Sequence, residues 1–289
     1  MREQLRKEIP KGRCFFCNSV FSKAAMTKHL TSCKARATSE AALQKSRRSS
    51  KNNKSFHILV EGRYLPEYWM HLEVKAKATL DDLDEFLRDI WLECCGHMSA
   101  FTIGGRTFIS GPERESGEEG FDIELDKLLT PKITFYHEYD FGTTTDLTLK
   151  VLSEREDSTS EWPVQLLARN EAPQINCDIC GKPATMVCTQ CIEEGGWLCS
   201  ECAEEHECGE DMLLPVTNSP RVGVCGYTGN GDDEDDDLDW EDEDDEGFFD
   251  DEEDDDYGEN GEDDDDLFAD DLMFDEEDEE DLFEDDEEE

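Results

Sequence analysis

The chain has 289 residues, and its 77 acidic against 27 basic side chains give a net charge of −50 at pH 7. The charge is uneven, because residues 1–55 hold 14 Lys or Arg and 3 Asp or Glu, whereas residues 232–289 hold 41 acidic residues and no basic one. No run of 18 apolar residues and no apolar leader is present, so we expect a cytoplasmic protein with no membrane contact and with reduced cysteines.

Residues 13–34 contain the first Cys/His pattern, Cys-x2-Cys-x11-His-x3-Cys. Zinc binds four thiolate or imidazole ligands in a tetrahedron, and two ligands four residues apart lie on one face of a helix. Free or reactive thiols would leave this spacing unexplained. The pattern therefore predicts a zinc finger with the ligands Cys14, Cys17, His29 and Cys33.

Residues 35–55 are polar and basic and are predicted to form a linker, with a short helix near Ala41. Clustered Lys and Arg side chains suit phosphate contact. We therefore expect residues 13–55 to bind nucleic acid, through Lys23, Lys28, Arg36, Arg47 and Arg48. Finger spacing does not distinguish a nucleic acid from a protein target, so a protein contact through the same surface remains an open alternative.

Residues 56–170 carry the alternating and helical patterns of an α+β domain. We expect a mixed or antiparallel sheet with two helices, the first capped by Thr79. Gly104-Gly105 predicts a hairpin turn. The expected strands are Phe56–Val60, Trp69–Val74, Ile133–Tyr139 and Asp146–Leu152, and the expected helices are Leu80–Leu92 and Phe121–Leu129.

The run Phe-Tyr-His-Glu-Tyr-Asp-Phe-Gly at residues 135–142, followed by Thr-Thr-Thr-Asp-Leu, resembles the Tyr-x-Tyr-Asp-Phe-Gly signature of the plasmid pRiA4b ORF-3-like family. Trp69 and the run Leu80-Asp-Asp-Leu also fit, and the resemblance covers about residues 56–155. The chain departs from the family after Trp69, where many members have Arg, and after Gly142, where many have Asp. The resemblance implies an α+β fold and nucleic-acid-related, mobile-element-associated biology, without a settled activity.

The signature residues Tyr139, Asp140, Phe141 and Gly142 have two interpretations. Asp140 beside a histidine at position 57, 71 or 97 could support acid–base chemistry. Alternatively, the aromatic residues belong to a strand and Asp140 caps a turn, which we favour. We therefore assign no catalytic residue, and we expect Cys94 and Cys95, at the end of the first helix, to be buried thiols.

Residues 174–230 hold eight further metal-ligand residues, enough for two four-coordinate zinc sites without an open position. We expect an interleaved arrangement, similar to B-box and related cross-braced zinc modules, with Cys225 as a spare that could replace Cys208. The first site would contain Cys177, Cys180, Cys199 and Cys202, and the second Cys188, Cys191, His206 and Cys208. With the finger, the sequence predicts about three zinc ions per chain.

Residues 231–289 are predicted to be a disordered acidic tail, since charge repulsion is large and apolar residues are sparse. Small apolar clusters such as Leu238-Asp-Trp240 and Phe248-Phe249 suit a basic protein partner or the chain's own basic head, whereas a solubilising role is the plainer alternative. We expect a zinc-binding interaction or adaptor protein. The alternatives are a protein scaffold that binds no nucleic acid and an enzyme of unknown chemistry in the central domain.

Overall fold

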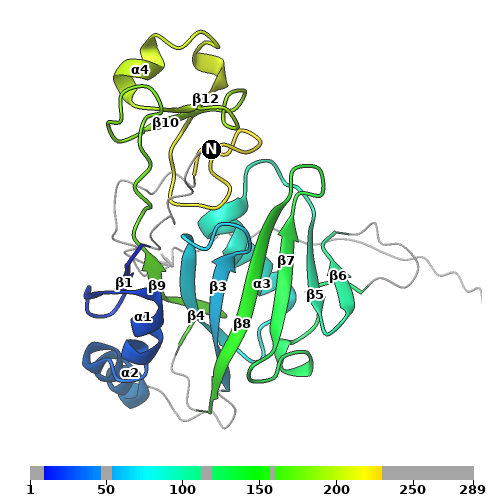
Figure 1. The fold of residues 1–289 in the computed structure, drawn as a ribbon. Coiled ribbons are helices and arrows are strands. Elements are labelled where there is room, and N and C mark those ends of the chain that lie inside the picture. The colour runs from blue at the N-terminus through cyan, green and yellow to red at the C-terminus, as the bar shows by residue number, and fades with distance from the viewer. Residues whose placement is uncertain (1–9, 47–53, 112–118, 157–159, 230–289) are drawn as a thin grey trace, which may run out of the picture. The chain divides into compact units, whose positions relative to one another are not determined.

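The computed structural model describes residues 10–46, 54–111, 119–156 and 160–229 (Figure 1). The predicted tail, residues 231–289, lies outside these ranges, as do Arg47 and Arg48. Among the described residues, no helix is long and apolar enough to cross a membrane.

A nine-stranded sheet of antiparallel pairs forms the centre of the fold, in the order β2-β1-β9-β4-β3-β8-β7-β5-β6. This architecture confirms the expected class, a largely antiparallel sheet with few helices. The bounds of the strands are β1 Gly12–Cys14, β2 Val20–Phe21, β3 Ser55–Gly62, β4 Trp69–Lys75, β5 Ser99–Ile103, β6 Arg106–Ile109, β7 Thr134–Tyr139, β8 Thr145–Arg155 and β9 Val164–Asn170.

One face of the sheet packs against the first central helix. The side chains of Phe56, Ile58 and Val60 alternate along β3 and are fully buried in the main core. Helix α3, Leu80–Leu87, begins at a capping box in which Thr79 and Asp82 bond each other's backbone N–H. A π-helical turn, η1 at Arg88–Leu92, continues α3 to the predicted end and buries two further apolar residues.

The prediction of a second helix at Phe121–Leu129 is wrong. This segment contains one 3₁₀ turn, η2 at Leu125–Lys127. Phe121, Leu125 and Leu129 are buried, whereas Ile123 and Leu128 are partly buried. However, the backbone N–H groups of Leu125 and Asp126 donate to the carbonyls of Ala78 and Ala76, at 2.8 and 2.9 Å. These donors are therefore used by a neighbouring segment, and a regular helix cannot form.

The finger covers part of the opposite face of the sheet. Strand β1 pairs with β9, and Met26 and Leu30 of helix α1, Lys23–Leu30, share a buried cluster with Trp69 and Leu167. At Gly12 a Cβ atom would lie 2.4 Å from the Trp69 ring, so only glycine allows this approach. The finger is thus an extension of the central sheet.

Helix α2, Lys34–Ser46, occupies most of the segment that we expected to be a linker. The buried Arg36 guanidinium forms ion pairs with Glu40 of α2 and with Glu73 of β4. Arg155 of β8 bonds the same two carboxylates. These ion pairs attach the first part of α2 to the sheet.

A second, small sheet has the order β11-β10-β12. Its strands are β10 Met186–Cys188, β11 Trp197–Leu198 and β12 Leu213–Pro215, accompanied by helix α4, Ser200–Glu204, and the turn η3, Glu210–Met212. Val187 of β10 and Val222 are buried members of the main core. Residues 174–229 therefore share a core with the central domain.

Candidate metal centres

The finger ligands come from elements that follow one another in the chain. Cys14 ends β1, Cys17 lies in the turn that follows, His29 is in α1, and Cys33 immediately precedes α2. Their four ligand atoms all lie within 4.8 Å of one another. The Sγ atoms of Cys14 and Cys33 are 4.0 Å apart, close to the edge of about 3.8 Å expected for a tetrahedron with Zn–S bonds of 2.3 Å. This donor set fits zinc.

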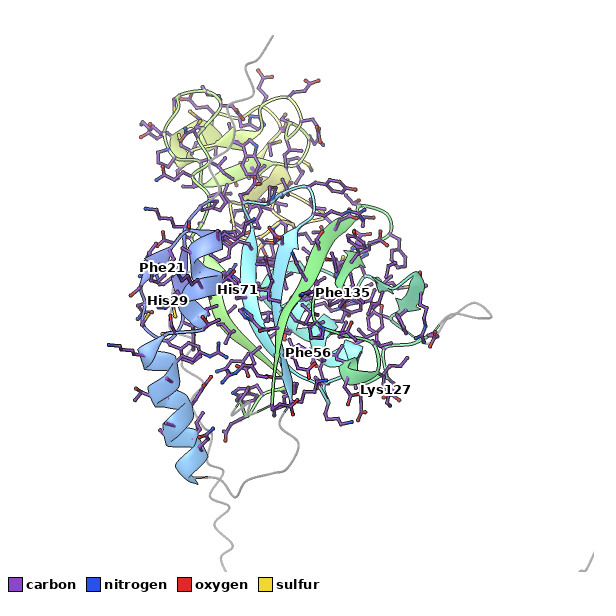
Figure 2. All side chains as sticks on the ribbon, turned by 60° about the horizontal axis from the view of Figure 1, so that its bottom comes forward. Phe21, His29, Phe56, His71, Lys127 and Phe135 are labelled. Carbon is purple, nitrogen blue, oxygen red and sulfur yellow. The ribbon has the colours of Figure 1, made fainter. Side chains whose placement is uncertain are left out.

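The His29 ring is held in place by the small core of the finger. Phe21 of β2 stacks on the His29 ring with centroids 4.2 Å apart, and both side chains are labelled in Figure 2. The Nε2 atom of His29 lies 3.3 Å from the Cys17 Sγ atom. The local apolar pattern thus orients the imidazole toward the thiols.

The two predicted clusters of the second module are assembled as the interleaved spacing indicated. One consists of Cys177, Cys180, Cys199 and Cys202, and the other of Cys188, Cys191, His206 and Cys208. Within each cluster the ligand atoms lie within 4.8 Å of one another. The pairing of Val187 with Trp197 between β10 and β11, and a hydrogen bond from Asp178 N to the Trp197 carbonyl, bring the cysteine pairs together.

The thiol pKa differs among the cysteines of the clusters. Burial raises the pKa of Cys14 to about 11. For Cys177, burial also opposes ionisation, but backbone N–H groups that include that of Cys180 lower the pKa to about 6. For Cys188, burial raises the pKa, but a hydrogen bond from His206 and backbone N–H groups lower it by more, and the result is a pKa of about 7. Such N–H donors also stabilise a metal-bound thiolate.

A fourth cluster, which the sequence analysis missed, consists of Cys94, Cys95, His97 and Cys225. It corrects two expectations, since Cys94 is half-buried and Cys95 exposed, and Cys225 does not join the second module's sites. All 13 cysteines of the chain now belong to four clusters. The signal that could have revealed it was an unassigned Cys-Cys-x-His run together with one unassigned cysteine.

The signature residues lie beside this fourth cluster. Tyr139 ends β7, and Asp140 follows with φ +66°. The Asp140 Oδ1 atom accepts hydrogen bonds from the N–H groups of Gly142 and Thr143 at 3.0 and 3.2 Å. Its Oδ2 atom accepts from Arg221 Nη2 at 2.7 Å. Burial alone would raise the pKa of Asp140, but Arg221 and these N–H donors lower it, so the carboxylate stays ionised.

The comparison with known protein families selects the central part of the chain. Residues 55–190 match the family described as Plasmid pRiA4b ORF-3-like protein. These residues, which we call the pRiA4b ORF-3-like domain, are similar to that family. The match includes the signature at Tyr139–Gly142 and the first cysteines of the second module.

Two further comparisons add little to the family assignment. A solved structure, described as the crystal structure of a protein of unknown function, MM3350, from Methanosarcina mazei Go1, is 17% identical and covers 39% of this chain and 69% of its own chain, with a TM-score of 0.34. No curated protein matches the chain.

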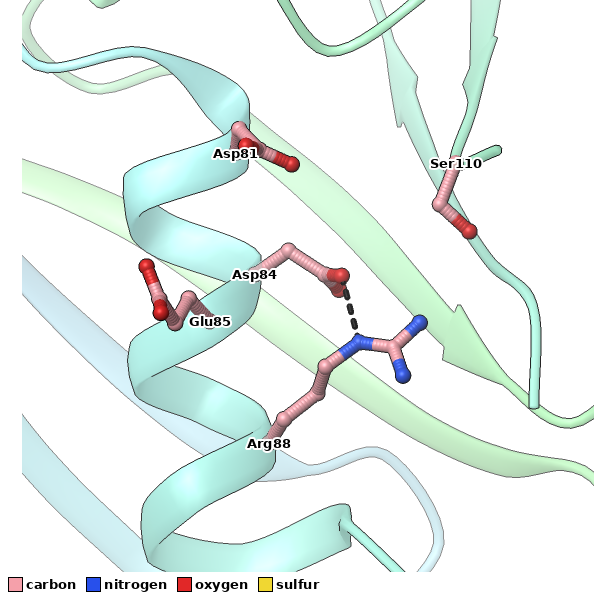
Figure 3. Close-up of a pocket in the computed structure, with 5 residues that line it drawn as sticks. All are labelled: Asp81, Asp84, Glu85, Arg88 and Ser110. Atoms are coloured by element: carbon pink, nitrogen blue, oxygen red, sulfur yellow. Dashed lines mark hydrogen bonds and ion pairs between the residues drawn. The ribbon is translucent and has the colours of Figure 1, made fainter. Parts of the chain in front are cut away.

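A polar pocket lies on the pRiA4b ORF-3-like domain, between α3 and β6 (Figure 3), and is lined by Asp81, Asp84, Glu85, Arg88 and Ser110. Asp84 accepts hydrogen bonds from Arg88 Nε at 2.6 Å and from Ser99 Oγ at 2.9 Å, and lies 2.7 Å from His137 Nε2. His137 is fully buried and so cannot reach a substrate. This network stabilises the fold beneath the pocket.

The other histidines considered for catalysis are placed apart from Asp140, except His97. His57 Nε2 and His71 Nδ1 lie 3.0 Å apart. Burial lowers the pKa of His57 to about 4 and that of His71 to about 3, so both rings are neutral. His97, a member of the fourth cluster, has its Nε2 atom 3.5 Å from Asp140 Oδ2.

The predicted nucleic-acid-binding residues differ in their exposure to solvent and in their ion pairs. Arg36 is only 6% exposed and is engaged in ion pairs, so it is a structural residue and not a phosphate contact. Lys23 pairs with Glu61 of β3. Lys28, on the other hand, is exposed on α1, and Lys34 is exposed at the start of α2.

Proposed function

We propose that this protein is a zinc-stabilised adaptor that binds a charged macromolecular partner and does not act as an enzyme. The observation that carries the proposal is that each cluster supplies four Cys or His ligand atoms within 4.8 Å of one another. Catalytic zinc sites keep one position open for water or substrate, whereas structural sites are closed by four protein ligands. Closed sites support a role in holding binding surfaces in place.

Zinc is the metal that this chemistry favours. Thiolate and imidazole ligands suit zinc, whereas magnesium and calcium prefer oxygen ligands. No Asp or Glu belongs to the clusters found among the described residues. Iron–sulfur clusters are also held by four thiolates. Three of the four Cys/His clusters in this protein include a histidine, which favours zinc over iron–sulfur.

The proposed partner is nucleic acid, in contact with the basic head, residues 1–55. This segment carries 14 basic and 3 acidic residues. Its described surface includes the exposed Lys28 and Lys34, on adjoining helices of the finger side. The acidic residues 232–289 would compete for the same cations, because a tethered polyanion acts at a high effective concentration.

The test is DNA affinity across salt concentrations, for the full chain, for a chain ending at Gly231, and for the double variant Lys28→Glu/Lys34→Glu. Truncation is expected to strengthen binding at low salt, with a difference that narrows as salt rises. The double variant should lower the slope of log affinity against log salt by about 2, since each phosphate contact contributes about 0.9. Lys127→Glu, at an exposed lysine of η2 that Figure 2 labels, is the matched control and should bind as the full chain does.

The second candidate is a protein scaffold that contacts a basic protein through residues 232–289. The composition of this segment, with 41 acidic residues and no basic one, favours it. In that case the DNA affinities would be equal for all variants, and an arginine-rich peptide would bind the full chain but not the chain ending at Gly231. That pattern would replace nucleic acid as the partner.

A further inference from the structure

The fourth cluster has the dimensions of a metal site. Cys94 and Cys95 Sγ lie 3.7 Å apart, and Cys95 and Cys225 Sγ lie 3.8 Å apart. A tetrahedral site with Zn–S bonds of 2.3 Å has S···S edges of about 3.8 Å. His97 Nε2 faces the same centre, at 2.9 Å from Cys95 Sγ and 3.2 Å from Cys225 Sγ. The cluster therefore matches the three predicted ones in donor type and size.

The backbone is shaped to bring these ligands together. After η1 the chain becomes extended at Glu93, with ψ 125°, and then turns at Gly96, with φ +74°. The Glu93 carboxylate accepts a hydrogen bond from the Gly96 N–H and another from the Tyr139 hydroxyl, which fixes the turn. Cys225 also has a positive φ, +50°. Two turns from distant parts of the chain thus present their side chains to one point.

A buried arginine offsets the charge that a bound ion would leave. Three thiolates, one neutral imidazole and one divalent cation carry a net charge of −1. Arg221 Nη2 lies 3.4 Å from Cys94 Sγ, and its side chain is fully buried. Asp140 holds this guanidinium from the other side at 2.7 Å. The His97 ring packs edge-on against Tyr139 at 5.7 Å between centroids.

We propose that Cys94, Cys95, His97 and Cys225 bind a fourth zinc ion, which fastens residues 217–229 to the pRiA4b ORF-3-like domain. The segment is already attached by Arg221 and by the Ser219 hydroxyl, which donates to the Trp91 carbonyl at 2.6 Å. In this account Tyr139 and Asp140 of the family signature are positioning residues. Tyr139 orients His97, and Asp140 holds the arginine beside Cys94.

The measurement is zinc per folded chain, for the full-length protein purified with a phosphine reductant and without chelator. The full chain is expected to hold four zinc ions, one for each cluster, and Cys225→Ser and Cys95→Ser are each expected to hold one fewer. Thr228→Ala, at an exposed residue of the same segment, is the matched control and should keep the full number. Because the wild-type count is itself a readout, the test remains decisive if a variant does not fold.

Trypsin cleavage at Arg221 provides the second readout. Arg221 is fully buried, so cleavage should be slow in the full chain and at least about tenfold faster in Cys225→Ser, which corresponds to a loss of about 1.4 kcal/mol in local stability. The proposal is overturned if the wild type holds three zinc ions, or if Cys225→Ser and Cys95→Ser both hold as many as the wild type. For protein purified without reductant, a count of free thiols two below 13 after denaturation with chelator would show a disulfide in place of the metal and would overturn the proposal.

Discussion

Cys177→Ser is expected to unfold residues 174–229 and to weaken the central domain as well. Small modules of this kind depend on metal, and apparent binding free energies of structural zinc in finger peptides are about 10–16 kcal/mol at pH 7. Serine does not replace a thiolate ligand. The core of the module's own cluster contains only Cys188, Leu198 and Ala203 as buried members, which is too little to fold without metal.

The effect should reach the central domain because the two parts share apolar contacts. Val187 and Val222 are buried in the main core, and Ile192, Trp197 and Leu214 pack against it. Loss of the module would expose this surface to water. The stability of the pRiA4b ORF-3-like domain therefore falls, although its sheet provides enough core to remain folded.

Hydrogen exchange and zinc content measure both effects in Cys177→Ser. Amides of β10 should exchange as in an unfolded chain, those of η1 should lose part of their protection, and at least one zinc ion should be lost. Ile179→Ser is the matched control, since Ile179 is 66% exposed and lies in the same Cys-x-x-Cys turn. Unchanged zinc content and β10 protection in Cys177→Ser would show that this cysteine is not a ligand.

Asp140→Asn is expected to lower the free energy of unfolding by about 3–5 kcal/mol, because it removes the carboxylate that pairs with the buried Arg221 guanidinium. Asparagine tolerates the left-handed conformation at φ +66°, and its side-chain oxygen still accepts hydrogen bonds from Gly142 and Thr143. The substitution therefore removes the charge while retaining the turn. The side chains of Arg221 and Asp140 are 0% and 7% exposed, so water cannot replace the lost interaction.

Urea unfolding of Asp140→Asn gives this difference directly. Glu119→Gln is the matched control, since Glu119 pairs with Arg106 at the surface, where the two side chains are 40% and 53% exposed. An exposed pair contributes about 0–1 kcal/mol. If both substitutions lower the free energy of unfolding by the same small amount, the Asp140–Arg221 pair does not hold residues 217–229 in place.

The features that the sequence predicted correctly depend on short spacings. The interleaved arrangement of Cys177 to Cys208 follows from four closely spaced ligand pairs, and Thr79 before an amphipathic run marks the start of α3. The strands of the central sheet follow from alternation of buried and less buried residues, as in β7 and β8. In each case the decisive residues are near one another in the chain.

The features that the sequence did not predict depend on distant contacts. Gly12 pairs with Asn170, so the finger extends the main sheet, and the ion pair of Arg36 with Glu73 attaches helix α2 to the sheet. Within a basic run, no local pattern distinguishes an arginine that will be buried, such as Arg36, from one that will be exposed to solvent. The fourth cluster joins residues 94–97 to Cys225, and only the tertiary fold brings them together.

The most direct test of the central claim is native mass spectrometry of the full chain, before and after treatment with a strong chelator, with circular dichroism of both samples. We expect one zinc ion for each of the four clusters, and loss of folded signal from the finger and the second module when the metal is removed. Three zinc ions would remove the fourth site and keep the others. A folded chain that holds no zinc, and that keeps its spectrum and melting temperature with chelator present, would contradict the account.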